Sequence, residues 1–203
     1  MWQLFRPNSR LLQGGSGLIN TQQQKVIISP IGKRDNELIE LIAAEIESVF
    51  EHKTKTIPLL DSVDFAFDPV RRQYHSTPIL EKLSELAPSQ AIKVLGIVQD
   101  DLFIPILTHV YGEAQLGGKA CIVSTHRLKE GLSLTGSRHI YYNRITKEAI
   151  HELGHTFNLR HCPDHFCIMH YCRTVKDVDG KSDQLCRYCK TLLEDEMKKP
   201  AKK

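Results

Sequence analysis

Two histidines and a glutamate stand close together in the segment His151-Glu152-Leu153-Gly154-His155. On a helix, residues four apart lie on one face, so both imidazoles can reach one metal ion. Zinc binds neutral histidine through a ring nitrogen at about 2.0–2.1 Å. Glu152 points away from the first ligand, where it can take a proton from a water molecule that zinc activates. Chance pairing in a His-rich chain is the alternative for this segment taken alone.

His161 lies six residues after His155, at the spacing of the third ligand in the extended zinc-protease motif. To reach back, the helix must end and the chain must reverse its direction. Glycine usually occupies this turn, and here the position is Asn158, the other residue type that tolerates the left-handed conformation. Three neutral histidines leave a fourth zinc position open for water, which is the catalytic arrangement.

A cluster of cysteines follows the histidines, since five His and five Cys lie within the 39 residues from His151 to Cys189. Two close pairs separated by a loop suit a closed, structural four-thiolate zinc site, with ligands Cys162, Cys167, Cys186 and Cys189. Disulfides within each pair are the alternative, and they require an oxidising compartment. No apolar segment typical of a secretory signal follows Met1, so we favour zinc and a cytoplasmic location.

The two remaining cysteines, and two histidines between the ligands, lie outside the two predicted ligand sets. Cys172 could replace one of the four cysteines, whereas we expect Cys121 to be a buried apolar residue of a strand. His165 and His170 fall between the ligands and are predicted to be surface residues or to support the ligands.

Taken together, these residues resemble the archaemetzincin family of zinc metallopeptidases. The matching positions are His151, Glu152, His155, His161, Cys162, Cys167, Met169, Cys186 and Cys189. The chain departs from the family pattern at Asn158, where the family has glycine. The segments 112–120 and 124–128 also resemble the family's sheet edge.

The resemblance implies a metzincin-like fold, α+β or α/β, with a twisted mixed sheet, two long helices and a small Cys-rich C-terminal part. It implies two zinc ions per chain, one catalytic and one structural. Met169 then corresponds to the Met-turn residue below the ligands, although its type alone would indicate a core residue. Tyr171 resembles a tyrosine that stabilises the transition state in related enzymes, and a packing role is the alternative. The strand Lys119–Thr125 is expected to border the cleft and to pair with an extended peptide.

Hydrophobic patterns predict the elements that must position these residues. Strands are expected at Lys25–Ile31, Thr56–Leu60, Ala91–Val98 and Lys119–Thr125. Helices are expected at Glu37–His52, Pro78–Ala87, Arg144–Phe157 and Tyr188–Met197. This order favours a mixed α/β sheet followed by a loop-dominated Cys-rich segment.

Length and charge limit the remaining possibilities. A chain of 203 residues with 25% charged residues fits one domain, which we place at 25–197, with an upper part 25–160 and a lower part 161–197. Residues 1–24 are expected to be a disordered lead and 198–203 a basic tail. These two ends carry a charge of +6 and the rest of the chain about −3, which together give the formal charge of +3. Because the basic residues lie in the ends, we expect no nucleic-acid partner. No apolar run approaches the roughly 20 residues that cross a bilayer, so we expect no membrane partner either.

The sequence therefore predicts a monomeric zinc peptidase that acts on peptides or proteins, with Glu152 as general base. The competing hypothesis is a catalytically weak or inactive zinc-stabilised module that binds a protein partner. A zinc-ribbon nucleic-acid binder is a third class, which the acidic body of the chain disfavours.

Overall fold

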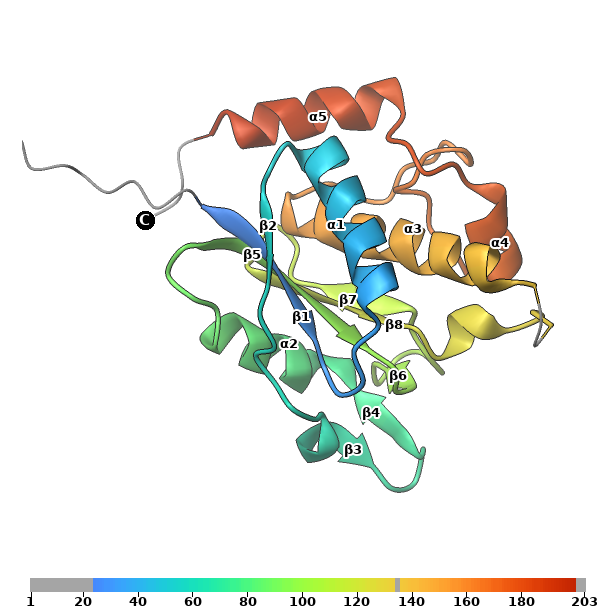
Figure 1. Ribbon diagram of the computed structural model, residues 1–203. Helices are drawn as coiled ribbons and strands as arrows, with labels where there is room; N and C mark the ends of the chain where they lie inside the picture. The colour runs from blue at the N-terminus through green and yellow to red at the C-terminus, as the bar shows by residue number, and fades with distance from the viewer. Residues whose placement is uncertain (1–23, 134–135, 200–203) are drawn as a thin grey trace, which may run out of the picture.

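The computed structural model describes residues 24–133 and 136–199 (Figure 1). The predicted disordered lead and basic tail lie mostly outside this part of the chain, because residues 1–23 and 200–203 are not described. Within the described ranges, no helix is long and apolar enough to cross a membrane.

A twisted sheet forms the centre of the molecule, and among the described residues it has five strands in the order β2-β1-β5-β8-β7. The strands are β2 (Thr54–Thr56), β1 (Lys25–Pro30), β5 (Ala91–Val98), β8 (Ala120–Ser124) and β7 (Gly112–Ala114). Neighbouring strands are parallel except β7, which pairs antiparallel with β8. The sheet is therefore mixed, as predicted.

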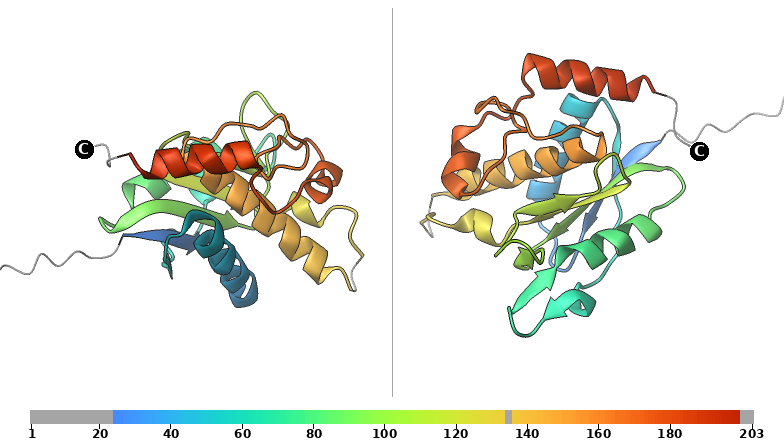
Figure 2. Two further views of the ribbon diagram at one scale, coloured as in Figure 1. Left: turned by 90° about the horizontal axis from the view of Figure 1, so that it is seen from above. Right: turned by 180° about the vertical axis from the view of Figure 1, so that it is seen from behind.

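Helices cover both faces of this main sheet (Figures 1 and 2). The two long helices, α1 (Asn36–Phe50) and α3 (Arg138–Thr156), lie on one face, and α2 (Ser76–Glu85) lies on the other. Side chains alternate along β1: Val26 and Ile28 join the core beneath α1 and α3, whereas Ile27 joins the core beneath α2. Burial on both faces explains why these strands are nearly continuous apolar runs.

A second sheet lies at the edge of the molecule near α2, and its strands were not predicted. It is formed by β3 (Phe67–Asp68), β4 (Gln73–His75) and β6 (Leu102–Phe103). A single-turn 3₁₀ helix at Asp64–Ala66 precedes β3, and another at Arg127–Lys129 follows β8. Strands of two or three residues leave too little periodicity to be recognised in a sequence.

The lower part of the chain leaves the end of α3 and runs back beside this helix (Figure 1). It contains the short helix α4 (Val175–Gly180) and the final helix α5 (Arg187–Met197). Helix α4 was not predicted, and Thr174 and Asp177 form a capping box at its start. The Cys-rich loops and these two helices form the small C-terminal part that the family resemblance implies.

Three sequence predictions were wrong in detail. The strand expected at Thr56–Leu60 is β2 and ends at Thr56. The helix expected at Arg144–Phe157 is α3 and begins earlier, at Arg138. Of residues 138–143 only Tyr142 is buried, so this first part of the helix shows no apolar periodicity. The strand expected to border the cleft, Lys119–Thr125, is β8 and lies between β5 and β7.

Candidate active site

Three histidines converge at the end of α3. His151, His155 and His161 each offer one ring nitrogen, and these atoms lie within 4.8 Å of one another. The Nε2 atoms of His151 and His155 are 3.1 Å apart. Nitrogen ligands at about 2.0–2.1 Å from one zinc ion would require a similar separation. The spacing predicted from the sequence therefore brings the three imidazoles together.

Backbone carbonyls fix the orientation of the first two imidazoles. Nδ1 of His151 donates to the carbonyl of Ile168 at 2.9 Å, and Nδ1 of His155 donates to the carbonyl of Leu159 at 2.7 Å. These bonds leave the Nε2 lone pairs directed at the common centre. Burial lowers the pKa of His151 well below its ordinary value and that of His155 to about 4, so both rings are neutral near pH 7.

The chain reverses after α3 at Asn158, which has the left-handed conformation with φ of 65°. The amide of Asn158 donates to the carbonyl of His155 at 2.9 Å, and the amide of Leu159 donates to that of Gly154 at 3.1 Å. These two bonds form a Schellman motif, which directs the following residues, including His161, back toward the helix. Asparagine thus fulfils the role that glycine has in the family pattern.

Met169 lies beneath the histidines and is fully buried. A Cβ atom added to Gly154 would approach the Met169 sulfur to 2.6 Å, so the thioether packs directly against the backbone of α3. Its carbonyl accepts from the amide of Cys162 at 2.9 Å. Met169 therefore joins the end of α3 to the loop that begins at Cys162.

Glu152 is buried and packs against Gly112 of the edge strand β7. A Cβ atom on Gly112 would meet the Glu152 Cγ at 2.5 Å, so only glycine allows β7 to approach the carboxylate so closely. Burial raises the pKa of Glu152 well above its ordinary value, and nearby Glu148 adds to this effect. A raised pKa makes the carboxylate a stronger proton acceptor.

An ion pair lies behind His151. Lys181 Nζ is 2.8 Å from Glu148 Oε1, and the side chains are 0% and 5% exposed. The same ammonium group lies 3.4 Å from His151 Nδ1. It opposes the effect of burial on the pKa of Glu152. Glu148 and Lys181 belong to no sequence motif, so this pair was not predicted.

A cleft of about 820 Å³ opens over the three histidines and Glu152. Edge strand β7 and the preceding segment 104–111 form one side, and Arg160, Tyr171 and Arg173 come from the lower part of the chain. The Tyr171 ring lies 5.0 Å from the His161 ring and is 42% exposed. Both Tyr171 and His161 are therefore accessible from the same cleft.

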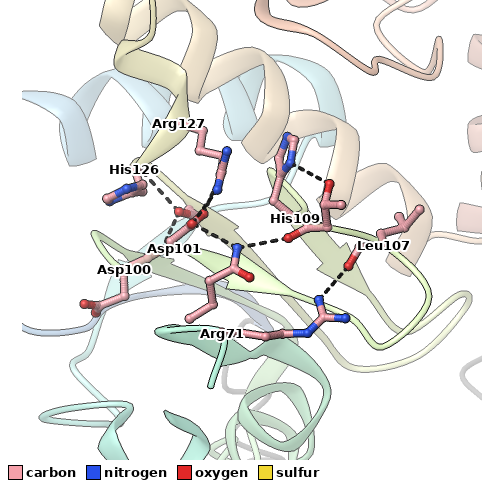
Figure 3. Close-up of polar contacts among 10 residues, drawn as sticks. Arg71, Asp100, Asp101, Leu107, His109, His126 and Arg127 are labelled. Atoms are coloured by element: carbon pink, nitrogen blue, oxygen red, sulfur yellow. Dashed lines mark hydrogen bonds and ion pairs between the residues drawn. The ribbon is translucent and has the colours of Figure 1, made fainter. Parts of the chain in front are cut away.

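A polar network supports the cleft segment 104–111 from behind (Figure 3). Arg71 Nη1 donates to the carbonyl of Leu107 at 2.9 Å, and Gln73 Nε2 donates to the carbonyl of Thr108 at 3.0 Å. Gln73 also donates to Asp101, which forms a two-bond ion pair with Arg127 at 2.7 Å. These residues are far apart in the sequence, so no motif could have revealed their association.

The four predicted cysteines form a second cluster, next to the first. The sulfur atoms of Cys162, Cys167, Cys186 and Cys189 lie within 4.8 Å of one another. All six cysteines of the chain are described and are free, so the disulfide alternative is not observed. Cys186 is the N-cap of α5, and its sulfur accepts from the amide of Cys189 at 3.5 Å. Burial raises the pKa of Cys186, but this amide and the neighbouring thiols reverse the effect and lower the pKa.

Neither the three-histidine cluster nor the four-cysteine cluster includes Cys121, Cys172, His165 or His170. Cys121 is fully buried in β8, as expected. Cys172 lies in the cleft wall and not in the four-cysteine cluster. His165 and His170 contact each other, with His165 Nδ1 at 3.1 Å from His170 Nε2.

Comparisons with known proteins agree with this geometry. The model of peptidase family M54 matches residues 17–195. A curated relative named archaemetzincin from Haloquadratum walsbyi is 34% identical, covering 83% of this chain and 98% of its own. Archaemetzincin from Archaeoglobus fulgidus is 32% identical with similar coverage, 83% and 98%.

Solved structures show the same similarity. Archaemetzincin from Methanopyrus kandleri superposes with a TM-score of 0.78 at 29% identity, covering 90% of this chain and 99% of the other. The structure of the Archaeoglobus fulgidus protein, a complex with malonate, has a TM-score of 0.70 at 32% identity, covering 83% and 99%.

Proposed function

The chain belongs to the archaemetzincin family, peptidase family M54, and is a zinc metallopeptidase; from this we propose that His151, His155 and His161 hold the catalytic zinc and that Glu152 is the general base. The single observation that carries this proposal is the convergence of three oriented imidazoles within the cleft that Glu152 also lines. The neutral state and fixed orientation of His151 and His155 suit the needs of a zinc ligand.

When bound, zinc lowers the pKa of water to about 7 and polarises a peptide carbonyl. Glu152 accepts the proton of the attacking water and delivers it to the leaving amine. Gly112 leaves room for the carboxylate beside β7, so the carboxylate faces the side of the cleft where a substrate would lie. We propose that the hydroxyl of Tyr171 donates a hydrogen bond to the developing oxyanion.

The peptide substrate is proposed to extend along β7. Since β8 is covered by β7 on the cleft side, the free backbone groups of the main sheet at this edge belong to Gly112–Ala114. An extended peptide can add to such an edge as a further strand. This replaces β8 as the strand expected to contact substrate.

We propose that Cys162, Cys167, Cys186 and Cys189 hold a second, structural zinc ion. Four sulfurs leave no open position for water. The site joins the loop after His161 to the start of α5 and so stabilises the small lower part. Free thiolate ligands suit a reducing compartment, and we propose a cytoplasmic monomer.

The test is cleavage of a broad peptide library by zinc-loaded protein and by the Glu152→Gln variant. We expect the variant to retain both zinc ions and its unfolding temperature while kcat falls by about 10²-fold or more. Glu85→Gln, on the exposed surface of α2, is the matched control. Undiminished turnover by the Glu152 variant would contradict the mechanism, and no turnover by wild type would favour the protein-binding module.

A further inference from the structure

His165 and His170 are two histidines that the catalytic and structural sites do not use. Their facing ring nitrogens, Nδ1 of His165 and Nε2 of His170, lie 3.1 Å apart. The same distance separates the Nε2 atoms of His151 and His155. We propose that His165 and His170 form a third metal site, which binds a divalent cation with a preference for imidazole, such as Zn²⁺.

The orientation of His170 supports this proposal. Its Nδ1 donates to the carbonyl of Cys162 at 3.0 Å. This bond fixes the ring and assigns the lone pair to Nε2, the atom that faces His165. A histidine that ligates zinc is held by a backbone carbonyl in the same way, as His151 is by Ile168.

His165 can present its lone pair without a change of position. Without metal, its Nδ1–H donates to Nε2 of His170 across 3.1 Å. Because the side chain is exposed, its other nitrogen can carry the proton in contact with water. The ring then directs a second lone pair at the same point. Two nitrogens at about 2.0–2.1 Å from a tetrahedral ion are separated by about 3.4 Å, close to the distance present.

The loop that carries both residues is held by its own backbone. The amide of Cys162 donates to Met169, that of His170 to Cys167 and that of Cys167 to Asp164, at 2.9–3.1 Å. Cys162 and Cys167 are also members of the four-cysteine cluster. The two imidazoles are thus preorganised, which reduces the entropy cost of binding a metal. Water would fill the remaining coordination positions, so this site is weaker than the other two.

The experiment is a Zn²⁺ titration by calorimetry of protein that already contains its two resident zinc ions. We expect one additional equivalent, and we expect His165→Ala to weaken it by about 10-fold or more. His139→Ala, an exposed histidine on α3, should bind the additional ion like wild type. Nitrogen-detected NMR should show that added Zn²⁺ shifts His165 Nδ1 and His170 Nε2.

Three outcomes would overturn the proposal: no additional equivalent, an additional equivalent that His165→Ala retains in full, or NMR shifts confined to other histidines. His170→Ala serves as a second variant, and its resident zinc content shows whether the loop remains folded. Binding that depends on both histidines, with the resident zinc content unchanged, supports the site independently of catalytic turnover.

Discussion

Lys181 and Glu148 form a buried ion pair directly behind a proposed zinc ligand. Their Nζ and Oε1 atoms are 2.8 Å apart, and Nζ lies 3.4 Å from His151 Nδ1. A positive charge at this position repels a cation held by the histidines, and Glu148 compensates for it. The carbonyl of Lys181 also accepts from Lys147 Nζ at 2.6 Å, so the pair joins the end of α4 to the buried face of α3.

Removing either partner should destabilise the fold, and the two variants should differ in zinc affinity. Glu148→Gln and Lys181→Met each leave one buried charge uncompensated, which typically costs about 3–5 kcal/mol. Glu148→Gln retains the Lys181 ammonium beside His151 and should weaken zinc binding. Lys181→Met removes the charge that repels the zinc ion, so it should not weaken zinc binding. Urea unfolding of the metal-free proteins and zinc competition with a chelator measure the two effects.

The double variant Glu148→Gln/Lys181→Met is the control for this pair. It contains no unpaired buried charge, so its unfolding free energy should exceed the value that additive single losses predict. Additive losses, or identical zinc affinities in both single variants, would show that the pair does not act as a unit.

Gly154 and Met169 should show strong coupling. Gly154→Ala normally gains helix propensity of about 1 kcal/mol, but here the new Cβ would lie 2.6 Å from the Met169 sulfur. We expect Gly154→Ala to lower stability, and Met169→Ala to cost about 2–5 kcal/mol through the cavity it leaves. In the double variant, the alanine methyl enters that cavity and recovers part of the loss. Thermal unfolding of all four proteins gives the coupling energy, and its absence would place Met169 away from Gly154.

Local spacing explains why the ligands were predictable and the ion pair was not. His151 and His155 are four residues apart, so helix geometry alone brings them together. Glu148 and Lys181 belong to different segments, and both residue types are usually exposed. The same argument applies to Asp101 and Arg127, whose contact depends on the packing of β6 and the segment after β8.

The arrangement of short strands also could not be derived from the sequence. β7 has three residues, all partly exposed, so it carries no alternating pattern, whereas β8 is an obvious apolar strand. The family resemblance led us to expect Lys119–Thr125, which is β8, at the cleft, whereas the short strand β7 occupies that edge.

Two arginines in the cleft wall should influence substrate choice. Arg160 and Arg173 line the cleft, and within residues 24–133 and 136–199 neither guanidinium forms an ion pair with a carboxylate. We expect peptides with Glu near the scissile bond to be cleaved with higher kcat/KM than matched peptides with Lys. An exposed charge contact contributes up to about 1 kcal/mol, or roughly 5-fold.

The double variant Arg160→Gln/Arg173→Gln should lose this preference, while Arg187→Gln on exposed α5 should retain it. The preference should also decrease with added salt, because screening weakens exposed charge contacts. Equal kcat/KM values for the two peptides in wild type would remove these arginines from the substrate contacts.

Chelation should remove two zinc ions in separate steps with different consequences. The three-histidine site has an open position and lies in an open cleft, whereas the four-cysteine site is closed and two of its sulfurs belong to almost fully buried residues. The first ion to leave should therefore be the one proposed at the histidines, and peptide cleavage should disappear with it while far-UV circular dichroism is unchanged.

Loss of the second zinc ion should lower the unfolding temperature, because binding energy at a structural site contributes to folding. The variant Cys186→Ser/Cys189→Ser should contain one zinc ion and unfold at lower temperature. Elemental analysis at each chelator concentration gives the stoichiometry, and activity that survives the first step would assign that step to the cysteines instead.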